Sequence, residues 1–112
     1  MAQAVIRGYL EALRSHLQRP EPSEELPLAS QTEEVIAADC TRFTLQCSGR
    51  LLSSSNQAYR AGYDFYQSRT GSNQAFPVEA WPGKRAAALA HIAEKFEYFQ
   101  AVEGDDGLLY VA

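Results

Sequence analysis

The chain has 112 residues, of which 46% are hydrophobic and 21% charged, and its formal net charge is -4. This length predicts a single domain, residues 1–112, with its own core, and the composition excludes a wholly disordered chain. The acidic balance argues against nucleic-acid binding, which requires a basic face to neutralise phosphates. An acidic surface is ordinary for a cytoplasmic protein, and it also suits an inhibitor of a basic partner.

The N-terminal residues and the cysteines indicate the compartment. Charged residues appear at Arg7 and Glu11, before an apolar run could form a signal peptide, and no stretch approaches the roughly 20 apolar residues of a membrane span. Cys40 and Cys47 are too far apart for a disulfide in either a helix or a strand. We therefore expect a soluble, cytoplasmic protein of bacterial type, with free thiols and no membrane partner.

Residues 2–19 predict an amphipathic helix, because apolar side chains recur at helical spacing. The stripe consists of Val5, Ile6, Tyr9, Leu10, Leu13 and Leu17. Pro20 ends this helix, and residues 20–30 predict an extended loop rich in Pro and Glu between the first and second helices.

The second predicted helix begins at Ser30, where Ser30-Gln-Thr-Glu33 matches a capping box. Its apolar stripe consists of Ile36, Cys40, Phe43 and Cys47. The competing interpretation is a strand from about Thr41, because apolar residues also alternate there. Gly49 is the predicted C-cap of the helix.

A third helix is predicted from a cap within residues 53–56 to about Ser68, with an ion pair between Arg60 and Asp64. Residues 70–74 have turn chemistry. The strongest helix pattern begins at Lys84.

Two endings of this fourth helix are open, so residues 97–112 predict either a helix end or a hairpin. The helix extends to Val102, or it stops near Phe96 and residues 98–102 pair with residues 108–111 across a turn at residues 104–107. The expected fold is mainly α, a compact bundle of four amphipathic helices with or without a short C-terminal hairpin. An α+β fold is the alternative.

The sequence predicts no catalytic residue, metal ligand or cofactor. His91 and Glu94 are one helical turn apart, but there is no Cys-x-x-Cys or His-Glu-x-x-His pattern. Nucleophile-elbow and phosphate-loop patterns are also missing from the sequence. Enzymatic activity is therefore the less favoured interpretation.

Aromatic and arginine side chains are concentrated between residues 59 and 81. Tyr, Trp and Arg are enriched at the energetic centres of protein interfaces. The predicted partner-binding residues are Tyr59, Arg60, Tyr63, Tyr66, Arg69, Phe76 and Trp81. The other interpretation is that the three tyrosines are boundary residues of the core.

These patterns predict a non-catalytic protein that binds another protein, as a regulator, inhibitor or accessory subunit. Self-association through a helix face, as a homodimer, is a further arrangement that the patterns allow. The alternative is a small ligand-binding protein or enzyme with a tyrosine-lined pocket between helices, in which His91 or Asp64 supplies the polar group. Burial distinguishes the two, because a concave pocket favours a ligand and an exposed patch favours a protein.

Overall fold

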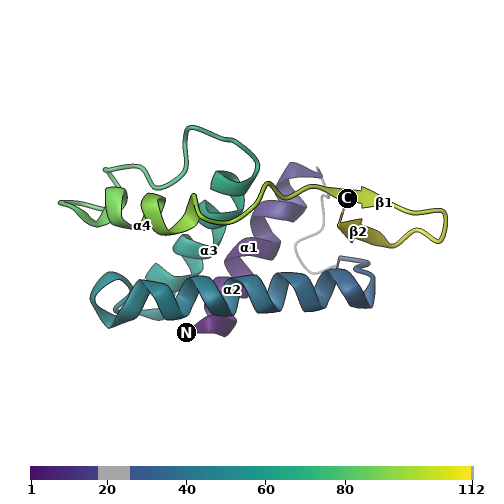
Figure 1. The fold of residues 1–112 in the computed structure, drawn as a ribbon, viewed down its shortest axis with the longest axis horizontal. Helices are drawn as coiled ribbons and strands as arrows, with labels where there is room; N and C mark the ends of the chain where they lie inside the picture. Colours follow the sequence, from purple (N-terminus) through teal and green to yellow (C-terminus); the bar gives the residue numbers. More distant parts are fainter. Residues whose placement is uncertain (18–25, 112) are drawn as a thin grey trace.

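The structure is a computed structural model that describes residues 1–17 and 26–111, and for residues 48–51 the backbone alone. Its elements in chain order are α1 (Ala2–His16), α2 (Ser30–Leu51), α3 (Ser55–Arg69), α4 (Arg85–Ala93), β1 (Ala101–Glu103) and β2 (Leu109–Val111) (Figure 1). The predicted mainly helical fold is confirmed, and all four helices contribute to one hydrophobic core. The two strands form a short antiparallel sheet near the C-terminus.

α1 turns a slightly different face to the core than the predicted stripe indicated. Val5, Tyr9 and Leu13 are buried, whereas Ile6 and Leu10 are only partly covered. α1 ends at His16, and the predicted stop at residue 20 lies outside the described residues, as does most of the loop rich in Pro and Glu.

α2 decides between the two alternatives for residues 41–47, which are helical. The four residues of the predicted stripe are all buried: Ile36, Cys40, Phe43 and Cys47. The predicted start at Ser30 is confirmed, but the predicted capping box and the predicted C-cap at Gly49 are wrong. The N-cap is Ala29 rather than Ser30, with no side chain capping the first turn, and Gly49 lies inside the helix, which continues to Leu51.

The start of α2 is instead fixed by the C-terminal hairpin. The amide of Leu109 donates to the carbonyl of Pro27 at 2.7 Å, and the carbonyl of Leu109 accepts from the amide of Ala29 at 3.0 Å. The same carbonyl accepts from Oγ1 of Thr32 at 2.8 Å, and Thr32 is wholly buried. A long-range contact therefore replaces the predicted capping box, because it satisfies the buried polar groups at this end.

α3 begins as predicted within residues 53–56, since the side chain of Ser54 accepts a hydrogen bond from the amide of Gln57. The predicted ion pair is present, with 3.1 Å between Nε of Arg60 and Oδ2 of Asp64. α3 continues one residue beyond the predicted end, to Arg69.

The hairpin is the ending that the structure adopts after α4. α4 stops at Ala93, and Val102 pairs with Tyr110 in the antiparallel register of β1 and β2. Gly107 in the connecting turn has a φ of 81°, a conformation that glycine adopts at little cost. The Asp-Gly pattern between two apolar runs thus predicted the turn correctly.

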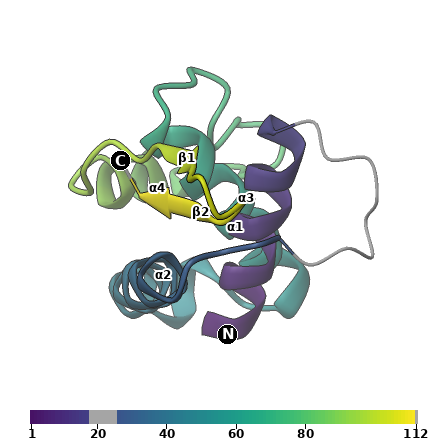
Figure 2. The same ribbon diagram turned by 90° about the vertical axis from the view of Figure 1, so that its right-hand side faces the viewer.

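α1 and α3 cross at a pair of glycines. A Cβ atom at Gly8 would lie 1.8 Å from the carbonyl oxygen of Tyr59, and one at Gly62 would lie 1.9 Å from that of Val5. Because no side chain fits at such distances, only glycine lets the two backbones touch. Figure 2 shows the result: α1 and α3 lie side by side, and α2, seen nearly end on, runs along the other side of the molecule.

Candidate functional site

The structure buries four of the seven predicted partner-binding residues. The exposed fractions are 1% for Trp81, 4% for Phe76, 3% for Tyr66 and 8% for Arg69. These side chains belong to the core, so the outward face expected from the sequence is reduced to Tyr59, Arg60 and Tyr63 on α3. The physical reason is that the loop after α3 folds back over the helix and carries Phe76 and Trp81 inward.

A buried carboxylate holds this loop in place. Nε1 of Trp81 donates to Oδ2 of Asp64 at 2.8 Å, and Arg60 pairs with the same oxygen. Asp64 is wholly buried, and its other oxygen has no hydrogen-bond partner among the described residues. Phe76 adopts a φ of 54°, which is unusual for a bulky residue and is maintained by packing against Phe43 and Trp81. The sequence-based alternative placed Asp64 in a ligand pocket, whereas the structure shows it tying the loop to α3.

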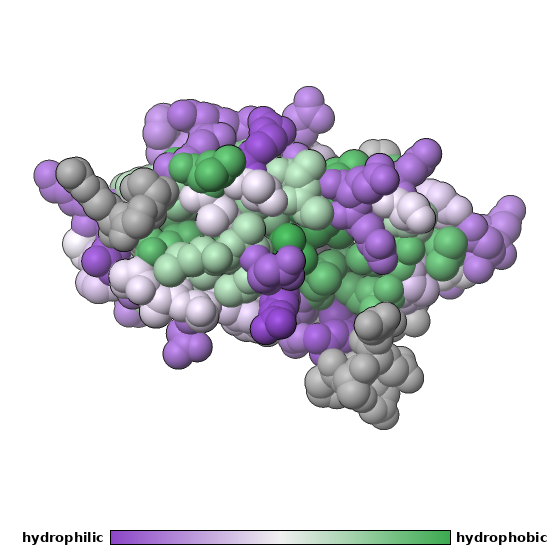
Figure 3. Space-filling view, turned by 90° about the horizontal axis from the view of Figure 1, so that it is seen from below, coloured by the Kyte–Doolittle hydropathy of each residue, from purple (hydrophilic) through white to green (hydrophobic). Residues whose placement is uncertain are grey.

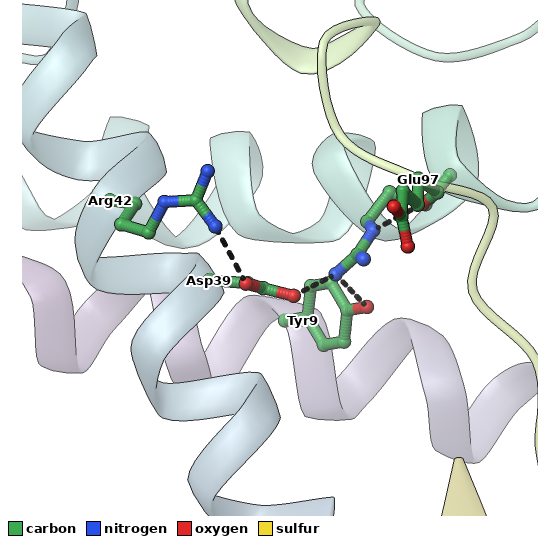
Figure 4. Close-up of polar contacts among 5 residues, drawn as sticks. Tyr9, Asp39, Arg42 and Glu97 are labelled. Atoms are coloured by element: carbon green, nitrogen blue, oxygen red, sulfur yellow. Dashed lines mark hydrogen bonds and ion pairs between the residues drawn. The ribbon is translucent and has the colours of Figure 1, made fainter.

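Arg69, at the end of α3, binds three other parts of the chain, and Figure 4 shows its partners Tyr9, Asp39 and Glu97 converging from them. Its Nη1 donates to Oδ2 of Asp39 at 2.8 Å and to the hydroxyl of Tyr9 at 3.3 Å, and its Nε donates to the carbonyl of Glu97 at 2.9 Å. The guanidinium also lies 5.3 to 5.8 Å from three phenylalanine ring centroids, those of Phe65, Phe96 and Phe99. Arg69 therefore connects α1, α2 and the segment after α4, and such charge-assisted hydrogen bonds are strong when shielded from water.

Burial suppresses ionisation of the core thiols and phenols. It raises the pKa of Cys40 and of Cys47 to about 12, and that of Tyr66 to about 12. It also raises the pKa of Tyr9, against the opposing effect of Arg69. Since a thiol reacts as the thiolate, both cysteines are poor nucleophiles in the folded protein.

His91 lies on the surface of α4, where its Nδ1 is 3.0 Å from a carboxylate oxygen of Glu94. Residues 1–17 and 26–111 contain no group of three or more His, Cys, Asp or Glu side chains placed to hold a metal ion. A cavity of about 110 Å³ is lined by Tyr66 together with His16 and Tyr98, and His91 is not among its lining residues.

A larger groove lies between α1 and the start of α2, and we name it the α1–α2 groove. Its volume is about 420 Å³. Its apolar surface comes from Leu10, Leu26, Leu28 and the ring of Tyr59. Figure 3 shows the face of the molecule seen from below, where hydrophobic surface forms a band along the middle that hydrophilic side chains border and interrupt.

The charged side chains of the α1–α2 groove balance one another. They are Arg7, Glu11, Arg14 and Glu33, and Arg14 forms an ion pair with Glu11. The three from α1 and the apolar Leu10 follow i, i+3, i+4, i+7 spacing, so they occupy one helical face. Partial burial, together with the nearby carboxylate of Glu11, raises the pKa of Tyr59. Its phenol therefore remains a neutral hydrogen-bond donor at neutral pH.

Tyr59 connects this groove to the remaining exposed part of the predicted surface. Its carbonyl oxygen meets Gly8 at the helix crossing, and its ring lines the α1–α2 groove with 39% of the residue exposed. Arg60 and the half-buried Tyr63 follow on the same helix. The close approach of α1 and α3 thus places the tyrosine at the edge of the groove.

Sequence reasoning missed most of the groove because its residues come from three separate segments. Leu26 and Leu28 offered one usable signal, since two apolar residues within a loop rich in Pro and Glu need a surface to pack against. Glu33 was assigned to the predicted capping box of the second helix.

Comparisons of the chain with protein-family models, with curated proteins and with solved structures find no match. Within the described part of the chain, no helix has the length and apolar character needed to cross a membrane. The α1–α2 groove is therefore the feature of the structure that indicates a function.

Proposed function

We propose that this protein acts without catalysis, by binding another protein through the α1–α2 groove. A short partner segment places an aliphatic or aromatic side chain against Leu10 and Leu28, beside the ring of Tyr59. This mode of action suits a regulator, an inhibitor or an accessory subunit. The observation that carries the proposal is the position of Tyr59, which joins an apolar groove to the exposed side chain of Arg60 and the half-buried ring of Tyr63.

The groove has the composition of a docking site for a side chain. Its apolar surface supplies the driving force, because covering it removes apolar area from water. Arg7 and the phenol of Tyr59 supply donors for backbone carbonyls of the partner. The balanced charges of the margin fit a partner segment without strong net charge.

A protein partner fits this site better than a small molecule does. The α1–α2 groove is a surface trough, whereas small-molecule sites enclose most of the ligand surface. Tyr59, Arg60 and Tyr63 extend the contact surface along α3, and these residue types dominate interface energetics. We place this activity in the cytoplasm, because Cys40 and Cys47 are free and buried, as suits a reducing compartment.

Affinity capture with matched tyrosine variants tests the proposal. Wild type, Tyr59→Ala and Tyr98→Ala are used as baits in an extract of the source cells, and captured proteins are quantified by mass spectrometry. Tyr98 is the control because it is 67% exposed and does not line the groove. A partner captured by wild type and Tyr98→Ala, but lost with Tyr59→Ala, is then purified for calorimetric titration.

In that titration we expect Tyr59→Ala to weaken binding by about 2 kcal/mol, roughly 30-fold, as for a central interface tyrosine. Equal binding by Tyr59→Ala and wild type would refute the groove as the docking site. Self-association of the wild type that Tyr59→Ala abolishes would replace the heterologous partner with a second copy of this chain.

A further inference from the structure

A second cavity, of about 260 Å³, lies between α2 and the segment that follows α4. We name it the Arg69 cavity, and its lining residues are Asp39, Arg42, Arg69, Lys95, Phe96 and Glu97. It shares no lining residue with the α1–α2 groove. Its lining contains three cationic side chains and two carboxylates, which leaves one positive charge in excess within a chain of net charge -4.

Asp39 neutralises two of these cations at once. Its Oδ2 is 2.8 Å from Arg69, and its Oδ1 is 3.4 Å from Arg42. Both guanidinium groups also lie near the ring of Phe96, at 5.0 Å for Arg42 and 5.8 Å for Arg69. Asp39 and the ring of Phe96 therefore hold the two guanidinium groups close together. Because two positive charges share one carboxylate, the arrangement favours binding of a further anion.

Hydrogen-bond donors remain open in this cavity. Among the described residues, Nη2 of Arg69 has no acceptor, whereas its Nε and Nη1 are both bonded. Lys95 is exposed and forms no ion pair with a described carboxylate. The side chain of Arg69 is itself only 6% exposed, which gives its remaining donors a fixed direction and partial shielding from water.

We infer that the Arg69 cavity binds a small oxyanion, held by Nη2 of Arg69, the guanidinium of Arg42 and the ammonium of Lys95. The chemistry is that of a phosphate or carboxylate group, since both present oxygen acceptors to a guanidinium fork. Glu97 is the competing anion at the rim, so its charge limits the affinity of the site.

Isothermal titration with inorganic phosphate and, separately, with acetate at constant ionic strength tests this inference. The arm that binds more tightly identifies the oxyanion class. We expect Arg42→Ala/Lys95→Ala to weaken binding at least about tenfold, because two charge-assisted contacts are lost. We expect Glu97→Gln to tighten binding about threefold, because the competing charge is removed while the backbone carbonyl that holds Arg69 remains.

The matched control is Lys84→Ala/Arg85→Ala, which removes the same total charge from positions that line neither the Arg69 cavity nor the α1–α2 groove. We expect this control to bind as wild type does. Absence of binding of either anion by wild type would overturn the inference. Equal weakening in the two double variants would also overturn it, because that result would indicate general charge attraction instead of a site. So would unchanged affinity in Glu97→Gln, because it would show that this carboxylate does not compete at the site.

Discussion

The two sides of α1 differ in the size of their residues, and they therefore differ in how closely the neighbouring helix approaches. On the flank toward α3, Gly8 and Gly62 allow the backbones to touch. On the flank toward α2, larger side chains such as Leu10 and Arg14 keep the elements apart and leave the α1–α2 groove. The same helix therefore provides a closed contact on one side and an open one on the other.

This difference indicates that the shape of the α1–α2 groove depends on the close crossing of α1 and α3. Tyr59 takes part in both, because its carbonyl oxygen faces Gly8 and its ring lines the groove. The opposite wall depends on the hairpin, since Leu109 holds the segment that carries Leu28. We therefore expect substitutions at the α1–α3 crossing to have the largest effect, those at the groove wall near Leu28 a smaller one, and those in the hairpin turn the smallest.

The largest effect is expected for Gly62→Ala. Its new methyl group would meet the carbonyl oxygen of Val5 at 1.9 Å, so α1 and α3 must separate. We expect a loss of about 3 kcal/mol in the free energy of unfolding, measured by urea denaturation followed by circular dichroism. Helix propensity alone would stabilise this variant by about 1 kcal/mol, so an increase in stability would contradict the close crossing.

Gly71→Ala is the matched control for that substitution. Gly71 has a φ of 83°, and no atom lies within 4 Å of the place where a Cβ would be added, so the new methyl group costs only backbone strain. We expect a loss of about 1 kcal/mol. Equal losses at the two glycines would mean that the crossing contributes nothing beyond conformational strain.

An intermediate effect is expected for Thr32→Val, which keeps the shape of the side chain and removes its hydroxyl. The carbonyl of Leu109 loses one of its two donors, and we expect a loss of about 1 kcal/mol. Hydrogen exchange should accelerate at the amides of Ala29 and Leu109 more than at those of α3. Uniform acceleration throughout the protein would show that the hairpin does not position the groove wall locally.

The smallest effect is expected for Asp106→Asn in the hairpin turn. The hydroxyl of Tyr110 donates to Oδ2 of Asp106 at 2.5 Å, and this bond lowers the pKa of Asp106 and raises that of Tyr110. The lowered pKa means that the contact stabilises the hairpin above the ordinary Asp pKa of 3.8 and is lost as the pH falls through the lowered value.

We therefore expect NMR signals of Tyr110 to change with acidification in the wild type and to be insensitive to this titration in Asp106→Asn. The melting temperature of the whole protein should not change between the two at neutral pH, because both side chains lie at the surface. An unchanged wild-type titration at Tyr110 would contradict the hydrogen bond.

Local patterns predicted much of the fold. The stripe from Ile36 to Cys47, the cap near Ser54 and the Asp-Gly turn each depend on neighbours in sequence, and the structure confirms them. The capping of the first turn of α2 was predicted wrongly because a residue distant in sequence satisfies its polar groups. Thr32 bonds to Leu109 across the fold, and no local rule anticipates that contact.

The candidate site was less predictable for the same reason. Aromatic residues fit both a core and an interface, so Tyr66, Phe76 and Trp81 could not be assigned before their burial was known. Arg69 was predicted to bind a partner because arginine is enriched at interfaces, yet Asp39 and Tyr9 from other helices bind its guanidinium inside the fold. Composition identified the right residue types, and topology decided which of them face water.

The contact between Trp81 and Asp64 gives the protein a built-in optical reporter. Trp81 is the only tryptophan in the sequence and is 1% exposed, so all indole emission comes from one enclosed position. Its ring is shielded from a collisional quencher for as long as the loop stays docked on α3. Quencher access that increases while helical ellipticity stays constant would therefore isolate the opening of this loop from unfolding of the helices.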